Sequence, residues 1–361
     1  MKKHPVITGI GFLNDWGAGK NNLARFLSEP VPQTPLDKID FDAYVDTSLV
    51  RRADHMSRCA LVAAKLALED AGLPIRYSED GTRVGIVLGT VHAPMHYTID
   101  YHTSLVLGDP KLSSPILFSD SVPNAAVSHI STVLGVRGYT ATLSGYCAVT
   151  QALQLGAELI EEGVVDICLV GGADVNHDFL VKAYGACLGN SELIAKVFGG
   201  SGFLVIESME YATQRKARVY AQLEGACAST ASYATAKRYG ISPLQELLHQ
   251  VDGKLQEYDC LLSSSNDEED SRQRMDMYLQ FFKHPKRVII DSSDSFGCGF
   301  SATEAFQLIL GILGVYSSEN LKSFKELSNF KKQIDHMFVM STALAGANAC
   351  ALFSHYSANK E

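Results

Sequence analysis

The sequence predicts a layered α/β fold built from two halves of similar order. Short apolar strands alternate with helical patterns in the first half, as expected for helices packed on a sheet. Residues 167–172 and 202–207 are apolar at successive positions, which is typical of strands covered on both faces. After residue 218 the alternation starts again, so we expect a duplicated fold with domains at residues 1–214 and 215–361.

The individual elements follow from hydrophobic periodicity and from the residues that end helices. The first helix ends at Gly72, because glycine readily adopts the left-handed conformation found after a helix. In chain order we expect a strand at residues 6–11, a helix at 57–68, strands at 84–89, 167–172, 202–207 and 219–223, a helix at 243–255, strands at 258–262 and 287–290, a helix from about 302 and a strand at 336–340.

The composition is that of a globular protein with a large core. The chain has 361 residues, of which 46% are hydrophobic and 20% charged. Its formal net charge of −9 argues against nucleic acid and anionic membranes as partners, because proteins bind both through clustered lysine and arginine side chains. No apolar run reaches the roughly 18–20 residues of a transmembrane helix, and the N-terminus leads into a strand instead of a signal-peptide core. We therefore expect a cytoplasmic protein.

Neither the cysteines nor the acidic residues form a metal-binding pattern. The 8 cysteines occur singly, without a C-x-x-C pair, so neither a zinc site nor a disulfide framework is expected. Four consecutive acidic residues at 267–270 are typical of a solvated loop. We assign no metal.

Cys147 stands where a catalytic nucleophile is expected. A strand-like run from residue 140 turns sharply at this cysteine into a helical pattern over residues 149–157. The dipole and the free N–H groups at a helix N-terminus favour a thiolate and can hold a developing oxyanion. The sequence therefore offers Cys147 as the candidate nucleophile.

Several segments, taken in order, resemble a β-ketoacyl-carrier-protein synthase of the thiolase fold. They cover nearly the whole chain: residues 7–11, 51–72, 84–90, 122–126, 140–148, 171–174 and 346–349. The resemblance implies a thiolase-like five-layer αβαβα architecture and a dimer with the strand before Cys147 near its interface. It also implies condensation of acyl and malonyl groups held on acyl carrier protein, with Cys147 at the nucleophile position.

The departures from the family pattern concern two histidines. Active members use them to polarise the malonyl thioester and to stabilise the enolate formed on decarboxylation. Ser264 falls at the first of these positions and Ser295 at the second. A serine hydroxyl is a poorer donor to an enolate and is not a base near neutral pH. Condensation by this chain alone is therefore not expected.

The pattern is similar to the chain-length factor, the catalytically degenerate β subunit of bacterial type II polyketide synthases. This resemblance implies a heterodimer with a competent ketosynthase α subunit, acting on an acyl carrier protein. The phosphopantetheine of the carrier protein would hold the substrates, so no cofactor of its own is implied. The partner would elongate the polyketide, while this chain would shape the tunnel and cap elongation.

The retained Cys147 leaves other functions open, because chain-length factors often carry glutamine at this position. A divergent acyltransferase or ketosynthase could use Cys147 as its acyl-accepting nucleophile, since acyl transfer needs a nucleophile and an oxyanion hole but no decarboxylation. A scaffold that stabilises its partner without shaping a tunnel is a third hypothesis.

One helical segment is the candidate for the closed end of the tunnel. Met95, Thr98 and His102 fall on one face of a helix, with Tyr101 beside them. By resemblance this segment closes the tunnel, so the volume of these side chains should limit the number of two-carbon units. The resemblance also brings Leu344 to the tunnel, in a loop that carries aromatic residues in relatives. Ordinary dimer packing is the alternative for the helix.

Overall fold

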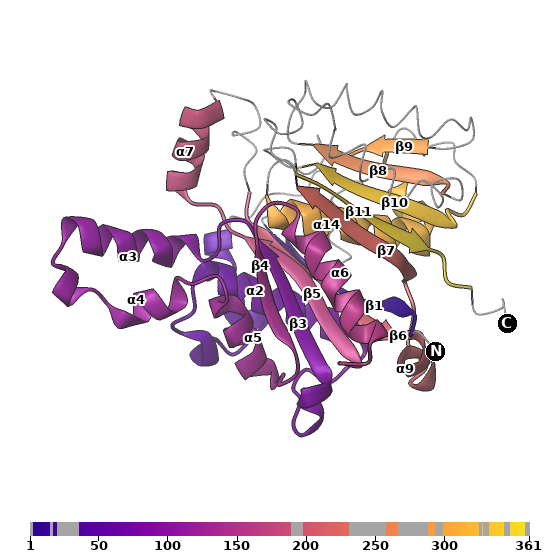
Figure 1. The fold of residues 1–361 in the computed structure, drawn as a ribbon, viewed down its shortest axis with the longest axis horizontal. Coiled ribbons are helices and arrows are strands. Elements are labelled where there is room, and N and C mark those ends of the chain that lie inside the picture. Colours follow the sequence, from indigo (N-terminus) through magenta and orange to yellow (C-terminus); the bar gives the residue numbers. More distant parts are fainter. Residues whose placement is uncertain are drawn as a thin grey trace.

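A mixed β-sheet with helices on its faces organises the computed structural model (Figure 1). The structure describes residues 3–14, 17–19, 36–188, 198–230, 258–265, 288–292, 299–324, 327, 332–342 and 347–357. The strands are β1 (Pro5–Asn14), β2 (Gly17–Ala18), β3 (Val84–Thr90), β4 (Thr140–Ser144), β5 (Ile167–Asp174), β6 (Gly200–Ser208), β7 (Ala221–Thr230), β8 (Cys260–Ser265), β9 (Val288–Asp291), β10 (His336–Thr342) and β11 (Ala347–Ser354). The main helices are α2 (His55–Ala71), α3 (Met95–Leu107), α4 (Pro115–Asp120), α5 (Ala125–Leu134), α6 (Ala148–Glu161), α7 (Asp178–Leu188), α9 (Met209–Gln214) and α14 (Ser301–Tyr316).

The two halves of the sheet have the same topology. The order across the sheet is β4-β3-β5-β6-β1 in the first half and β9-β8-β10-β11-β7 in the second, with β2 paired only to β1. Leaving β2 aside, both halves therefore place their third, second, fourth, fifth and first strands side by side. The first three strands in each list run parallel, and the last two pair antiparallel to their neighbours. This shared order confirms the predicted duplication.

The halves are joined through β1 and β7. Val6 pairs with Gln222 and Ile7 with Ala221, so a short antiparallel pairing joins the two halves of the sheet. The predicted boundary between residues 214 and 215 falls at the end of α9. Because the sheet runs through both halves, the division into two domains stays a prediction.

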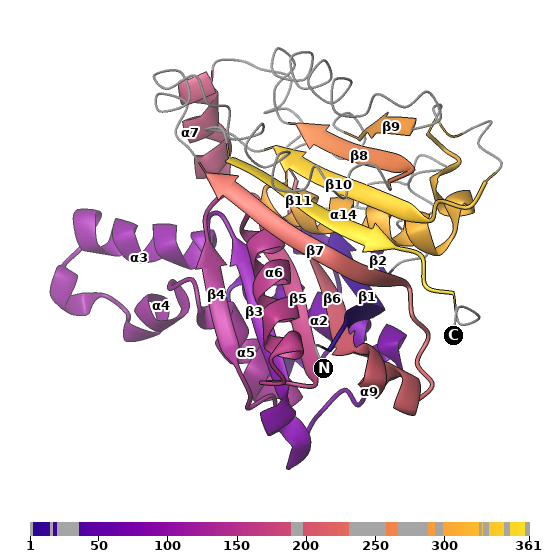
Figure 2. The same cartoon turned by 45° about the vertical axis from the view of Figure 1, so that its right-hand side comes forward.

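Helices α6 and α14 form the layer between the two halves of the sheet (Figures 1 and 2). Helix α6 contacts β3 and β5 of the first half and β7 of the second, and α14 contacts β5, β6 and β10. Every residue of α14 from Ser301 to Val315 is buried, as expected for a helix that is apolar on all sides. Helices α2 and α5 cover the opposite face of the first half. The predicted helix at residues 243–255 lies outside the described residues.

Most strands and helices of the described chain match the periodicity in the sequence. The sequence pattern did not indicate β2, the helices α4, α5, α7 and α9, or strand β11. This strand contains three alanines and an asparagine, residue types with low β-propensity, and it is stabilised by its pairing with β7 and β10. Strand β6 is buried on both faces as expected, but it pairs antiparallel to β1 and β5.

Helix α2 approaches β1 closely because β1 carries glycines where the two meet. A Cβ added at Gly11 would lie 2.2 Å from the carbonyl oxygen of Ala63 and 2.4 Å from the backbone nitrogen of Ala67. Both atoms belong to the backbone of α2, so neither can move aside by a rotamer change. The contact therefore requires glycine.

We expect Gly11→Ala to lower the free energy of unfolding by about 1–3 kcal/mol, because the added methyl forces α2 away from β1. Urea unfolding followed by circular dichroism measures this change. Arg76→Ala, at an exposed position after α2, serves as the control. A Gly11→Ala protein as stable as the control would contradict the close packing of α2 on β1.

Asp54 links the starts of two helices. Its carboxylate accepts hydrogen bonds from the backbone N–H of Met56 in α2 (2.8 Å) and of Tyr97 in α3 (3.3 Å). Burial of this side chain outweighs these bonds and raises its pKa to about 6. The protonated carboxyl is therefore favoured in the folded state relative to the unfolded chain.

Protonated Asp54 should stabilise the folded state. This contribution is fully present below the pKa of Asp54 in the unfolded chain, about 3.9, and is lost as the pH rises through its folded-state pKa of about 6. Relative to Asp54→Asn, the wild type should therefore lose up to roughly 3 kcal/mol of stability between about pH 4 and about pH 7. Urea midpoints of both proteins at the two pH values measure this difference. Parallel pH profiles would show that burial does not raise this pKa.

Candidate active site

Cys147 lies in the sharp turn between β4 and α6. It is the residue before the first turn of α6 and adopts φ 59° and ψ 22°, a left-handed conformation that is uncommon for a non-glycine residue. Gly145, with φ 137°, supplies the preceding bend, and its N–H donates to the carbonyl of Thr90 at 2.9 Å. The turn thus holds the cysteine at the helix N-terminus, in a conformation typical of constrained functional positions.

A buried carboxylate from the second half occupies the N–H groups of that helix N-terminus. Glu304 of α14 accepts hydrogen bonds from the backbone N–H of Val149 (3.1 Å) and Thr150 (2.9 Å) and from the Thr150 hydroxyl (2.6 Å). These donors are therefore engaged by the protein itself. Burial raises the pKa of Glu304, while the bonds from Thr150 and Val149 act in the opposite direction.

The Cys147 thiol is held in its protonated form. Its side chain is buried, and burial raises its pKa well above the usual value, with a further contribution from the nearby Glu304 carboxylate. The expected activation by the helix dipole is thus opposed by desolvation and by a negative charge. The structure gives this thiol a helix-terminal position but little nucleophilic activation.

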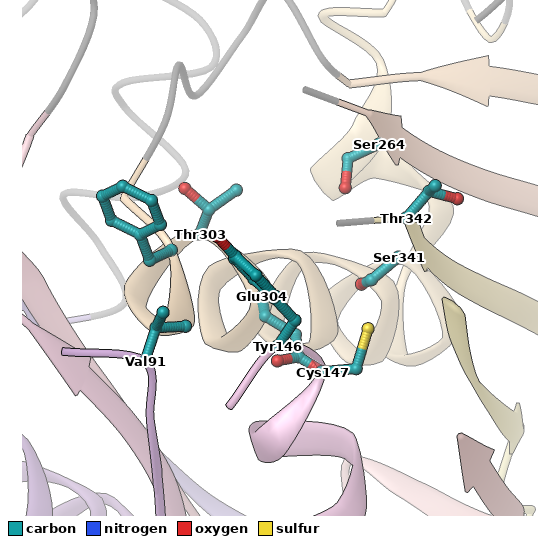
Figure 3. Close-up of a pocket in the computed structure, with 9 residues that line it drawn as sticks. Val91, Tyr146, Cys147, Ser264, Thr303, Glu304, Ser341 and Thr342 are labelled. Atoms are coloured by element: carbon teal, nitrogen blue, oxygen red, sulfur yellow. The ribbon is translucent and has the colours of Figure 1, made fainter. Parts of the chain in front are cut away.

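A pocket opens above the thiol where the two halves meet (Figure 3). The described residues that line it are Val91, Tyr146, Cys147, Ser264, Phe300, Thr303, Glu304, Ser341 and Thr342. In Figure 3 the Cys147 sulfur, from the start of α6, points toward Ser341 at the end of β10. Most other polar groups in this lining are hydroxyls, and none of the described lining residues is a histidine.

Ser264 lies in this pocket, at the end of β8. Its hydroxyl donates to the Gln307 side-chain oxygen at 2.6 Å, and the Ser341 hydroxyl donates to the same oxygen at 2.7 Å. The Gln307 amide nitrogen in turn donates to the Met340 carbonyl at 2.8 Å. This network fixes both serine hydroxyls, and a serine hydroxyl is not a base near neutral pH.

The other predicted site residues do not all join this pocket. Met95, Thr98, Tyr101 and His102 lie on α3 and are absent from the described pocket lining. Thr98 donates to the carbonyls of Pro94 (2.9 Å) and Ser121 (3.1 Å). Ser295, Leu344 and the acidic run at 267–270 lie outside the described residues.

Sequence reasoning missed the polar residues that α14 contributes. Glu304 and Gln307 are three positions apart in an otherwise apolar helix, and both are buried. Buried polar side chains require hydrogen-bond partners, so a pair of them inside a long apolar run indicates a polar network in the core. The sequence could thus have placed such a network at α14, although it does not identify the partners.

The described residues hold no group of three or more histidine, cysteine or acidic side chains that could bind a metal. The structure brings two of the described cysteines together across neighbouring strands. The sulfurs of Cys227 in β7 and Cys350 in β11 lie 3.3 Å apart. Within the described part of the chain, no helix is both long and apolar enough to cross a membrane.

In comparisons with known proteins, residues 9–186 match the model of the β-ketoacyl synthase N-terminal domain. The 3-oxoacyl-[acyl-carrier-protein] synthase 2 of Staphylococcus aureus (strain COL) is 27% identical over 259 residues, 62% of this chain and 62% of that protein. The 3-oxoacyl-[acyl-carrier-protein] synthase 1 of Buchnera aphidicola subsp. Baizongia pistaciae is 26% identical over 64% of this chain and 66% of that protein. The match thus spans less than two thirds of either relative.

Solved structures are similar over nearly the whole chain. The ishigamide ketosynthase/chain length factor aligns with a TM-score of 0.80 at 19% identity, covering 99% of this chain and 100% of that chain. A type II polyketide synthase acyl-carrier protein in complex with its ketosynthase bound to the hexaketide gives a TM-score of 0.76 at 20% identity, covering 99% and 100%. A β-ketoacyl synthase from Burkholderia phymatum gives 0.77 at 18% identity, covering 98% and 100%. These likenesses confirm the thiolase-like fold.

Glu304→Gln tests the electrostatics of the pocket. We expect it to lower the pKa of the Cys147 thiol, because it removes the neighbouring carboxylate while keeping a side chain of similar shape. The pH dependence of Cys147 alkylation by iodoacetamide, read by peptide mass spectrometry, measures this pKa. Glu319→Gln, at an exposed ion pair with Lys322, is the control. Identical profiles for wild type and Glu304→Gln would contradict the proposed influence of this carboxylate.

Proposed function

We propose that this chain, whose residues 9–186 match the β-ketoacyl synthase N-terminal domain, is the chain-length factor of a heterodimeric type II polyketide ketosynthase. It would shape the tunnel and cap elongation by a partner ketosynthase that works on acyl carrier protein. The substrates would be carried on the phosphopantetheine of the carrier protein, so this chain would need no cofactor.

The observation that carries this proposal is that no histidine is among the described residues that line the pocket beside Cys147. Ser264, which the family resemblance aligns with the first histidine, lines the described pocket, and its hydroxyl is bound to Gln307. The one carboxylate in the described lining, Glu304, is engaged at the N-terminus of α6. A protonated, buried thiol without a histidine lacks the groups that decarboxylative condensation requires.

An apolar surface on α3 and α4 is evidence for the binding of a partner subunit. These helices project from the body of the molecule in both views (Figures 1 and 2). Val106, Leu107 and Leu112 are 77%, 81% and 83% exposed, and Phe118 is 56% exposed. Large exposed apolar side chains clustered in this way mark interaction surfaces. Strand β4 is the last strand of the sheet path next to them and pairs only with β3 among the described strands.

Helix α3 also carries the proposed tunnel residues. Its N-terminal end is tied to α2 through Asp54, and Tyr101 packs on Phe118 of α4, with ring centroids 5.5 Å apart. Met95, Thr98 and Tyr101 are half-buried in this chain, so a partner could complete their surroundings. The similar structure named as the ishigamide ketosynthase/chain length factor is consistent with an arrangement of this kind.

One observation favours a second function, a divergent acyltransferase or ketosynthase that uses Cys147. The cysteine is retained in a strained turn at a helix N-terminus and lines an open pocket. The sequence relatives named 3-oxoacyl-[acyl-carrier-protein] synthase agree with that reading. An acyl adduct formed by the isolated protein from acyl thioesters, and absent from Cys147→Ala, would favour this function over the first.

In a synthase reconstituted with a competent ketosynthase and acyl carrier protein, Met95→Ala or Tyr101→Ala should lengthen or scramble the product distribution. The smaller side chains would leave more room at the closed end of the tunnel. Liquid chromatography with mass spectrometry of the released polyketides measures chain length. Thr103→Ala, exposed on the same helix, is the control and should give the wild-type products. An unchanged profile for both tunnel variants would rule out this assignment.

A further inference from the structure

Four aromatic side chains from four different elements meet beside the Cys147 pocket. Tyr146 precedes the cysteine, His92 follows β3, Tyr184 belongs to α7 and Phe300 precedes α14. The Tyr146 and Tyr184 hydroxyls lie 3.1 Å apart, and the Tyr184 hydroxyl lies 2.9 Å from Nε2 of His92. The Phe300 ring contacts the rings of His92 and Tyr184, with centroid distances of 4.2 and 5.2 Å. We refer to these four residues as the aromatic wall.

The wall has two layers relative to the thiol. Tyr146 and Phe300 line the pocket together with Cys147, whereas His92 and Tyr184 contact them without being part of the described lining. Tyr146 and Phe300 are therefore the members of the wall that line the pocket itself. Removal of the Phe300 ring would open the pocket toward His92 and Tyr184, both of which the ring contacts.

A buried carboxylate fixes the backbone on which this wall stands. Asp174, at the end of β5, accepts hydrogen bonds from the N–H groups of Val91 (3.0 Å), His92 (2.9 Å) and Ser301 (3.0 Å). The last of these residues directly follows Phe300. One carboxylate that is 1% exposed thus anchors the loops that carry both His92 and Phe300. The wall is consequently held by the core of the sheet.

Phe300 keeps a backbone conformation that is unfavourable for its residue type. Its φ of 51° and ψ of −118° lie in a region that glycine occupies readily and phenylalanine does not. The neighbouring residue Gly299 is packed against Phe198, and the N–H of Gly299 donates to the Thr303 hydroxyl at 2.7 Å. Strained residues of this kind cluster at functional sites, and here the side chain lines the pocket.

We propose that Phe300, backed by Tyr146, Tyr184 and His92, closes the Cys147 pocket so that the thiol has room for a short acyl group of acetyl size and not for an extended acyl chain. The opposite side of the pocket is limited by Ser264 and Ser341, which Gln307 holds in place. In an acyl transfer, the Cys147 sulfur would bond to the thioester carbonyl carbon, and the donor thiol would leave with the proton. Phe300 is thereby the specificity-determining residue of this site.

The proposal concerns the room beside Cys147 and does not rest on the assignment as a chain-length factor. The described tunnel residues of that assignment, Met95, Thr98, Tyr101 and His102, lie on α3, outside the described pocket lining. A chain-length factor with a closed pocket and an acyltransferase specific for short acyl groups both satisfy it. An alkylation result that contradicts the role of Phe300 would therefore leave the proposed function intact. A result that contradicts the proposed function would likewise leave the role of Phe300 intact.

Alkylation of Cys147 tests the proposal without requiring any catalytic activity. The full chain is treated with iodoacetamide or with its N-hexyl derivative at alkaline pH, where more of the thiol ionises, and the Cys147 peptide is quantified by mass spectrometry. In each reaction the sulfur–carbon bond forms as iodide leaves. Phe300→Ala and Phe300→Gly are compared with the wild type and with Phe179→Ala, which removes a 56% exposed phenylalanine of α7.

We expect both Phe300 variants to raise the rate of the N-hexyl reagent at Cys147 by about tenfold or more relative to iodoacetamide, because steric exclusion of extra methylenes has effects of this size. Phe300→Gly also relieves the backbone strain, so it guards against loss of folding in Phe300→Ala. Phe179→Ala should behave as the wild type. The proposal is overturned if Phe300→Gly yields no N-hexyl adduct at Cys147, or if the wild type already reacts equally well with both reagents.

Discussion

The two halves of this protein cap each other's helices with buried carboxylates at the point where the pocket forms. Glu304 in the second half binds the N–H groups at the start of α6, and Asp174 in the first half binds the N–H of Ser301 at the start of α14. A helix N-terminus buried without partners is costly, and a negative charge there also interacts favourably with the helix dipole. The same two carboxylates therefore join the halves, orient the central helices and set the charge around Cys147.

This arrangement explains why a cysteine in a nucleophile position is not activated. The helix terminus that would stabilise a thiolate or an oxyanion already binds the carboxylate of Glu304. Burial and that negative charge both raise the pKa of the thiol. Among the described lining residues, Ser264 offers only a hydroxyl that is bound to Gln307. These features are the ones on which the proposed role of a subunit that acts by its shape depends.

The sequence predicted the fold better than the site, for physical reasons. Duplication, the central strands and the turn at Cys147 follow from local periodicity and from residues such as Gly72, which encode their own conformation. The position of Ser264 came from a family resemblance. By contrast, Glu304, Gln307 and the aromatic wall depend on contacts between residues far apart in the sequence, such as Val149 and Glu304, which no local pattern encodes. Strand β11 was missed because pairing, and not propensity, stabilises it.

The central claim is that this chain acts with an unlike catalytic subunit, and native mass spectrometry of the protein purified from its own cells at natural expression levels tests it most directly. The account predicts an assembly with a similarly sized ketosynthase whose sequence carries the nucleophilic cysteine and both histidines. A homodimer without such a partner would contradict the account and favour an enzyme that uses Cys147 by itself.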